Sequence, residues 1–179
     1  MKIYNHLTPG FSELEWSMVK HIPPGGNWQN IPVSVPSKRL EQIRKGGGRT
    51  TYYGRLRKNK PSYTISTYFN RIGNGCHIHP EQNRLISMRE AARLQSFKDS
   101  FVFHASRASI YKQIGNAVPP ILARAIAELI EKHLENKNFV DLFAGAGGMS
   151  EGFLMQGFHL LGAIEIDKNF FETFLKNHK

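Results

Sequence analysis

A glycine-rich turn near residue 145 is the part of this sequence with the clearest chemical potential. The stretch D-L-F-A-G-A-G-G-M-S-E-G-F covers residues 141–153. Glycine is needed where backbone approaches a ligand closely, because any Cβ would intrude. Glu165 follows Gly147 by 18 residues, a placement that suits a carboxylate binding the hydroxyls of a ribose. The G-A-G-G spacing differs from G-x-G-x-x-G and disfavours a dinucleotide, although dinucleotides and S-adenosylmethionine both remain open on spacing alone.

Two short apolar runs and two helices must position this turn. N-F-V-D-L-F-A-G begins as a strand ending at Asp141, and the glycine turn then starts a helix that Gly157 ends. F-H-L-L-G-A-I-E-I-D predicts a second strand closing in Glu165 and Asp167, and D-K-N-F-F-E-T-F-L-K-N-H-K predicts a second helix. This β-α-β-α order predicts the start of a doubly wound, parallel α/β sheet.

Two further helices are predicted before the glycine turn. Ser87 and Glu90 form an S-x-x-E capping box that indicates a helix start. The Gly-Asn pair at residues 115–116 predicts a turn, and the Pro-Pro pair at residues 119–120 suits the first turn of the next helix. That helix carries an apolar stripe, which we expect to pack against a large surface. The stripe consists of Ile121, Leu122, Ala125, Ile126, Leu129 and Ile130.

Positive charge is concentrated in the first three quarters of the chain. The formal net charge is +10, and 21 of the 24 Lys and Arg residues, but 9 of the 14 acids, precede residue 139. Residues 38–60 are densest, with nine basic residues against the single acid Glu41. A basic face of this kind favours nucleic-acid binding, although a merely soluble, lysine-rich surface is the alternative.

Aromatic side chains lie among these basic residues, in a region (residues 1–83) that is otherwise rich in turns. The basic residues are Arg55, Arg57, Lys58 and Lys60, and the aromatic ones are Tyr52, Tyr53 and Tyr63. They could contact phosphates and stack on sugars or bases. Alternation of side-chain types over residues 63–68 predicts a strand, so a tyrosine-rich sheet with a solvated charged edge fits as well.

Cys76 is the one cysteine, which rules out an internal disulfide and fits a reducing cytoplasm. The N-terminus lacks the apolar run of a signal peptide, and no run approaches the ~18 apolar residues of a membrane span. Cys76, His77 and His79 could suggest a metal site. Three clustered candidates without a fourth favour a loop instead, so we expect no bound metal. Because no long apolar run occurs, we also expect no membrane partner.

Four motifs together resemble those of the DNA (cytosine-5)-methyltransferases. D-L-F-A-G-A-G-G followed by G-F resembles the first motif of that family, and A-I-E-I-D the second. R-L-I-S-M-R-E-A-A-R-L-Q-S-F-K-D-S-F-V-F resembles the ninth, and Y-K-Q-I-G-N-A-V-P-P-I-L-A-R-A-I-A the tenth. The resemblance covers almost the whole chain, most weakly residues 1–30. It implies part of a target-recognition domain in 1–86, the motif helices in 87–137, and the start of a Rossmann-like domain in 138–179.

The resemblance also implies S-adenosyl-L-methionine as cofactor. Phe143, Gly145 and Gly147 would hold its methionine end, with Asp141 beside the amino-acid part. The full set of residues predicted to bind the cofactor is Asp141, Phe143, Ala144, Gly145, Gly147, Gly148, Glu165, Ile166, Asn116 and Val118.

The remaining cofactor roles fall on the second and tenth motifs. Glu165 would take the ribose hydroxyls, and Ile166 would pack on the adenine. Asn116 and Val118 would close the pocket from the other side. A plain core position is the alternative for Ile166, as it is for Phe143.

Double-stranded DNA is the partner that the resemblance implies. In the family the ninth motif organises the recognition region, and Arg89 and Arg93, four residues apart, share a helix face that could meet phosphates. The predicted DNA contacts are Arg55, Arg57, Lys58, Arg89 and Arg93.

The order of the motifs differs from the common arrangement, in which the first motif opens the chain and the tenth closes it. Here the ninth and tenth precede the first, which we interpret as a circular permutation. The tenth-motif helix is expected to pack beside the first strand, so residues 131–138 could bridge the two.

The catalytic motifs of the family do not occur in these 179 residues. The family uses a cysteine thiolate that follows a proline and attacks C6 of a flipped cytosine. Cys76 follows Gly75 instead, so we assign no catalytic residue. We expect a component or fragment of a DNA (cytosine-5)-methyltransferase of a bacterial or phage restriction-modification system, inactive alone.

Two sources of the missing motifs stay open. Either a second polypeptide carries the Pro-Cys motif, or the chain is an incomplete reading of a permuted enzyme. A non-catalytic DNA-binding or regulatory remnant is the alternative from another class, and an oxidoreductase fragment is a third.

Overall fold

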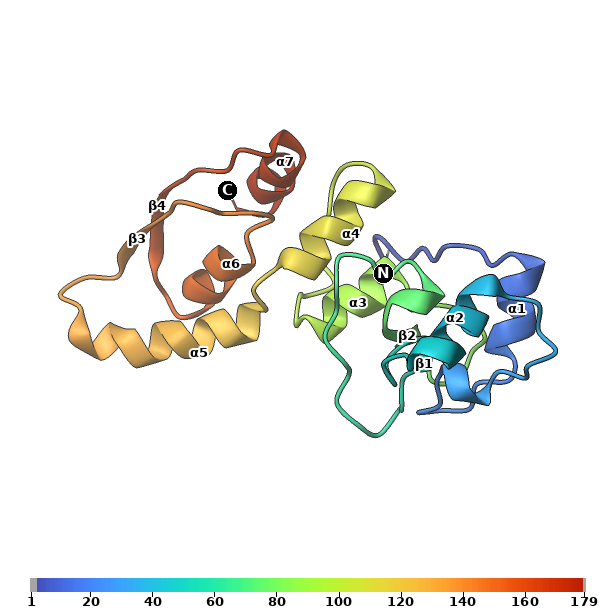
Figure 1. Ribbon diagram of the computed structural model, residues 1–179. Coiled ribbons are helices and arrows are strands. Elements are labelled where there is room, and N and C mark those ends of the chain that lie inside the picture. Colours follow the sequence, from blue (N-terminus) through green and yellow to red (C-terminus); the bar gives the residue numbers. More distant parts are fainter. Residues whose placement is uncertain (1–2, 179) are drawn as a thin grey trace. The chain divides into compact units, whose positions relative to one another are not determined.

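The computed structural model describes residues 3–178 and divides them into two compact units (Figure 1). Residues 7–87 form the N-terminal unit, and residues 3–6 together with 88–178 form the C-terminal unit. The predicted three-part division differs from this one, because the motif helices and the β-α-β-α segment share one unit. No helix in the described part of the chain is long and apolar enough to cross a membrane.

The N-terminal unit consists of short elements joined by turns. In chain order they are α1 (Glu13–Val19), the 3₁₀ helix η1 (Trp28–Asn30), α2 (Lys38–Gly46), β1 (Gly54–Arg55), the 3₁₀ helix η2 (Ile72–Asn74) and β2 (Cys76–Ile78). Ser12 and Glu15 form a capping box at the start of α1, and the Ser37 hydroxyl accepts the N–H of Leu40 at the start of α2. The turn-rich composition of residues 1–83 does not predict these two helices.

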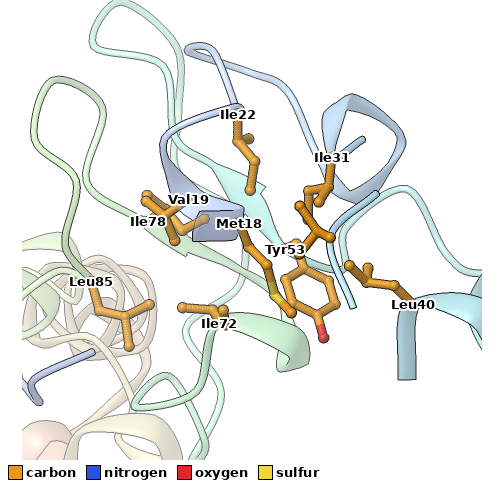
Figure 2. Close-up of a cluster of buried hydrophobic side chains, with 10 residues drawn as sticks. Met18, Val19, Ile22, Ile31, Leu40, Tyr53, Ile72, Ile78 and Leu85 are labelled. Atoms are coloured by element: carbon orange, nitrogen blue, oxygen red, sulfur yellow. The ribbon is translucent and has the colours of Figure 1, made fainter. Parts of the chain in front are cut away.

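An apolar cluster forms the core of the N-terminal unit (Figure 2). Its buried members are Met18, Val19, Ile22, Ile31, Val35, Leu40, Tyr53, Ile72, Ile78 and Leu85. In Figure 2 the side chains of Met18, Tyr53 and Ile72 point toward one another. Helices of seven and nine residues are marginal by themselves, so burial against this shared cluster stabilises α1 and α2.

The strand predicted for residues 63–68 is absent, and that prediction was wrong, because the segment is irregular. β1 pairs in parallel with β2 instead. On the other side of β1, the N–H of Gly25 donates to the carbonyl of Arg55, and the N–H of Arg55 donates to the carbonyl of Gly26, both at 3.0 Å. Both edges of β1 are therefore occupied, so residues 63–68 cannot pair with it. Alternating side chains do not by themselves form a strand without such a partner.

The C-terminal unit begins with helices. They are α3 (Met88–Leu94), α4 (Arg107–Asn116), α5 (Pro120–Ile130) and the 3₁₀ helix η3 (Glu131–His133). α3 begins directly after Ser87 and α5 begins at Pro120, as predicted. Residues 115–116 complete α4 rather than forming the predicted turn. The helix ends at Asn116, shortly before Val118. Val118 precedes Pro119, and a residue that precedes proline is disfavoured in helical conformation.

A β-α-β-α segment follows these helices and confirms the predicted α/β class. Its elements are β3 (Asn138–Asp141), α6 (Gly148–Met155), β4 (His159–Ala163) and α7 (Lys168–Asn177). β3 and β4 pair in parallel. Gly157, at φ +78°, follows α6 in the left-handed conformation. Beside β3, the aromatic rings of Phe139, Phe153 and Phe158 pack with centroids 5.1–6.4 Å apart.

α5 packs against α6 through its small residues (Figure 1). Ala123 and Ala127 are buried, and a Cβ on Gly152 of α6 would collide with Ala123 and with the backbone of α5. The predicted apolar stripe is not this contact face, since Ile121 and Leu129 are 61% and 63% exposed. The small residues allow the two helices to approach closely, and the large ones on the neighbouring face stay uncovered within the described structure.

Candidate functional site

A small pocket in the C-terminal unit lies between the glycine turn after β3 and the connection from α4 to α5. Its volume is about 60 Å³, and its lining residues are Gln113, Asn116, Ala117, Val118, Ala144, Gly145, Ala146, Gly148, Met149 and Phe170. Ligands of open α/β sheets bind beyond the carboxyl ends of the strands, and β3 ends at this turn. Pockets for drug-sized ligands measure roughly 300–1,000 Å³. This pocket therefore accommodates only part of a nucleotide-like ligand.

The glycine turn has a backbone geometry that strongly favours glycine. Gly145 and Gly147 have φ of +56° and +100°. A Cβ on Gly148 would collide with the carbonyl oxygen of Val118, so glycine is required for α6 to start this close to the α4–α5 connection. The N–H of Gly147 donates to the carbonyl of Ala144 at 2.8 Å and closes the turn. The sequence prediction of a tight glycine turn at this point is confirmed.

Two carboxylates stabilise the turn: Asp141 at the end of β3 and Glu165 just after β4. Ser150 donates its hydroxyl to Asp141 Oδ2 at 2.6 Å, which joins the end of β3 to α6. Glu165 accepts the N–H of Gly145 at 2.7 Å with Oε2 and the N–H of Asp167 at 2.8 Å with Oε1. Because a carboxylate oxygen can accept two hydrogen bonds, each Glu165 oxygen keeps room for one more donor.

Two large apolar side chains beside this site face solvent. Phe143, just after β3, is 93% exposed, and Ile166, next to Glu165, is fully exposed. Neither is a core residue of the described structure. Exposed apolar groups beside a pocket are typical of a surface that a ligand or a partner covers.

The structure brings half of the predicted cofactor residues into the pocket lining. These are Asn116, Val118, Ala144, Gly145 and Gly148. The others stand next to the lining: Asp141 and Glu165 through hydrogen bonds to the turn or to α6, Gly147 within the turn, and Phe143 and Ile166 at the exposed strand ends. Their roles in cofactor binding stay predictions.

Gln113 lines the pocket and was not predicted. Its side chain is 1% exposed, and its Nε2 donates to the carbonyl of His104 at 2.8 Å. Its Oε1 is buried without a hydrogen-bond partner among residues 3–178, an uncommon state that a donor on a bound ligand would relieve. Gln113 precedes Asn116 by three positions on α4, so the two residues lie on the same side of the helix. Once the helix was known, this spacing could have identified Gln113 as a second pocket residue.

Arg89 lies inside the C-terminal unit, so its predicted contact with DNA was wrong. Its side chain is fully buried. The guanidinium donates to the carbonyls of Tyr4 at 3.0 Å, Lys98 at 2.9 Å and Phe101 at 2.5 Å. Burial lowers the pKa of Arg89, yet an arginine keeps its charge. The residue ties the N-terminal segment to the loop after α3.

Arg55 is likewise buried, at 4% exposed, and the prediction that it contacts DNA was wrong. Its guanidinium has five N–H groups, and the structure gives all five an acceptor within the N-terminal unit. The acceptors are the carbonyls of Ile22, Val19, His79 and Gln82 and the side-chain oxygen of Asn83, at 2.6–3.0 Å. No donor is left for a phosphate.

The other predicted DNA contacts remain at the surface. Lys58 forms an exposed ion pair with Glu81 at 2.7 Å. Arg93 donates to both oxygens of Asp99, at 2.8 and 2.7 Å, and its side chain is 45% exposed. Arg57 is exposed and has no hydrogen bond or ion pair within the described part of the chain. Contact of these three residues with DNA stays a prediction.

Cys76 lies in β2 of the N-terminal unit and is partly buried. Burial raises the pKa of its thiol. Because the thiolate is the reactive form, this environment disfavours a nucleophile at Cys76.

Comparison with known proteins extends these observations. The profile of the family described as C-5 cytosine-specific DNA methylase matches residues 6–132 and 137–179. Type II methylase M.HgiDII of Herpetosiphon aurantiacus is 37% identical over 134 residues, which cover 73% of this chain and 38% of the relative. Type II methyltransferase M.PspPI of Psychrobacter sp. is 36% identical over 126 residues, covering 69% and 30%.

A plant relative is similar over a slightly larger share of the chain. DNA (cytosine-5)-methyltransferase 3 of Arabidopsis thaliana is 32% identical over 148 residues, covering 75% of this chain and 10% of the relative. The chain spans less than half the length of each of these three relatives. The family profile nevertheless covers nearly all of its residues, including the glycine turn and the pocket. The chain therefore belongs to the C-5 cytosine-specific DNA methylase family.

Proposed function

We propose that this chain binds S-adenosyl-L-methionine in its C-terminal unit and takes part in methyl transfer to C5 of cytosine in double-stranded DNA. The observation that carries the proposal is the pocket between the glycine turn and the α4–α5 connection, within one compact unit. The type II names of two relatives suggest a restriction-modification system as the setting.

The residues around the pocket fit this cofactor. Gly145 lines the pocket with open space beside its backbone, and the buried Gln113 Oε1 offers an unpaired acceptor to a donor such as an ammonium group. Glu165 would accept the ribose hydroxyls at its remaining lone pairs, and Ile166 would cover the adenine. When bound, the cofactor supplies a methyl group on a sulfonium, and the chain's own residues hold and orient it.

The order of the segments supports a circular permutation of the family's motifs. α5, which carries the tenth-motif resemblance, packs against α6, which follows the glycine turn. Only η3 and four further residues separate the end of α5 from the start of β3. A connection of this length joins the tenth-motif helix directly to the first strand.

The nucleophile would come from outside these 179 residues. Cys76 follows a glycine and is partly buried, its thiol pKa is raised, and it belongs to the other unit. We propose that a second polypeptide, or a further part of a longer enzyme, supplies the Pro-Cys motif. The exposed apolar residues of α5, β3 and β4 are consistent with such a partner, which would cover them.

Cofactor binding by the purified chain tests the first part. We expect Glu165→Gln to weaken S-adenosylmethionine binding in calorimetry by about tenfold, since two hydrogen bonds to a charged acceptor lose strength. Glu172→Gln, an equal charge change at an exposed position of α7, is the control and should bind like the parent chain. Binding of NADH in place of S-adenosylmethionine would overturn the assignment in favour of an oxidoreductase.

Methylation of DNA tests the second part. We expect the 179-residue chain alone to transfer no labelled methyl group to duplex DNA, because it lacks an activated thiolate. Methylation that Cys76→Ala abolishes would refute this account of the nucleophile. Duplex binding without any cofactor binding would instead favour a non-catalytic DNA-binding remnant.

A further inference from the structure

A second pocket lies entirely within the N-terminal unit, beside the turn that follows β1. Its volume is about 210 Å³, and it is open to solvent. Its lining residues are Gly25, Gly26, Thr50, Thr51, Gly54, Arg55, Leu56, Arg57, Lys60, Pro61, Tyr63 and Cys76. Three of these are basic and none is acidic, so the pocket has the composition of an anion site.

Arg55 lines this pocket, but its guanidinium is bonded to residues that do not line it. The side chain is 4% exposed, and all five of its acceptors are uncharged oxygens. No carboxylate among residues 3–178 pairs with it. In a partly buried environment a charge without a counterion acts over a longer distance than in water. Arg55 therefore adds positive charge to this region of the N-terminal unit, but it has no N–H left to donate to a ligand.

Arg57 and Lys60 supply the free donors. Both are exposed, and neither has a hydrogen bond or an ion pair within the described structure. Lys58, between them in sequence, is paired with Glu81 and does not line the pocket. The guanidinium of Arg57 lies on the backbone of Gly25, where a Cβ would collide with it. A glycine at position 25 thus lets this cation sit at the pocket.

Tyr63 adds an aromatic surface to the same pocket. Its side chain is 53% exposed, and it lines the pocket together with Lys60 and the hydroxyl-bearing Thr50 and Thr51. Unpaired cations next to an exposed aromatic ring are the combination that holds a phosphate and stacks on the adjoining sugar or base.

We propose that this pocket binds one backbone phosphate of the DNA substrate, with Arg57 and Lys60 donating to the phosphate oxygens and Tyr63 contacting the neighbouring nucleotide. This inference rests on the proposed function, which makes DNA the substrate. The contact positions the DNA and does not read its sequence, because phosphates are the same at every step.

The test is the salt dependence of duplex binding by the full chain. For the double variant Arg57→Gln/Lys60→Gln we expect the slope of log affinity against log salt to become shallower by about 0.9, the loss of one phosphate contact. The loss of affinity should be the same for unrelated duplex sequences. The matched control is Lys20→Gln/Lys132→Gln, which removes the same charge from two exposed lysines outside the basic stretch.

A second pair of variants isolates the aromatic contact. Tyr63→Ala should weaken duplex binding, and Tyr63→Phe should retain it, because packing against the sugar needs the ring and not the hydroxyl. Thermal unfolding of every variant checks that the N-terminal unit is intact.

The outcomes separate the two proposals. Equal slope changes in the two double variants, or no change in either, would overturn the phosphate pocket while leaving the proposed function in place. Absence of duplex binding by the parent chain would overturn both.

Discussion

In the N-terminal unit Val19, Leu40 and Phe69 are completely buried, whereas in the C-terminal unit Leu129, Leu161 and Phe143 are 63%, 68% and 93% exposed. The N-terminal unit has strands of only two and three residues, so there is little sheet surface to cover, and its helices close over one cluster. The C-terminal unit has a longer parallel pair, and parallel sheets are normally covered on both faces.

The difference shows how the two units relate to function. A closed core lets the N-terminal unit present Arg57 and Lys60 at an open basic pocket on its surface. The C-terminal unit forms the glycine turn locally, from β3, α6 and the α4–α5 connection, but leaves apolar side chains of α5, β3 and β4 uncovered. We therefore expect mutations to act differently in the two units.

The largest effect is expected at the buried guanidinium. Arg55→Met would leave five oxygens in the N-terminal unit without their donor and should lower the free energy of unfolding by at least about 3 kcal/mol. Lys58→Met, three positions on in an exposed ion pair, should change it far less, because solvent screens an exposed pair. Urea denaturation measures both, and equal effects would remove the structural role given to Arg55.

Truncation of a leucine in each unit compares their cores directly. Leu40→Ala, at a fully buried position, should cost about 2–5 kcal/mol in urea denaturation. Leu129→Ala, at a 63% exposed position, should cost less than about 0.5 kcal/mol. A large cost at Leu129 would mean that the apolar stripe of α5 is covered in solution.

Acid should weaken the N-terminal unit through His77. This side chain is buried beside Phe69, and burial lowers its pKa to about 4. Between that value and its ordinary pKa of 6.5 the unfolded chain binds the additional proton, so the free energy of unfolding falls as the pH drops through this window. The loss between pH 7 and pH 4 should be about 3 kcal/mol.

His77→Gln is the variant that checks this pH dependence. It removes the titrating group, so its stability should fall less than that of the parent chain when denaturation is repeated at pH 7 and pH 4. Parallel curves for the two proteins would show that His77 does not control the acid response.

The smallest effect is expected where α5 meets α6. Gly152→Ala would push a methyl group into Ala123 and the backbone of α5, at a cost of about 1–3 kcal/mol. Gly162→Ala in β4 is the matched control, since a Cβ there meets nothing within 4 Å. Indistinguishable thermal midpoints would argue against close packing of the two helices.

Local patterns were sufficient for much of this fold. The glycine turn, the β-α-β-α order, the start of α3 and the proline start of α5 follow from spacing, capping and turn chemistry, which act over a few residues. The same patterns failed for residues 63–68, because pairing depends on which strand edges are free in the folded unit.

What the sequence by itself determined is the family motifs, the glycine turn with Asp141 and Glu165 around it, and the basic character of residues 38–60. Only the tertiary structure decided which cations are available: Arg55 and Arg89 are buried, while Arg57 and Lys60 are free. The physical reason is distance along the chain. The acceptors of Arg55 come from segments more than 20 residues away on either side, and no local pattern reveals that such segments converge.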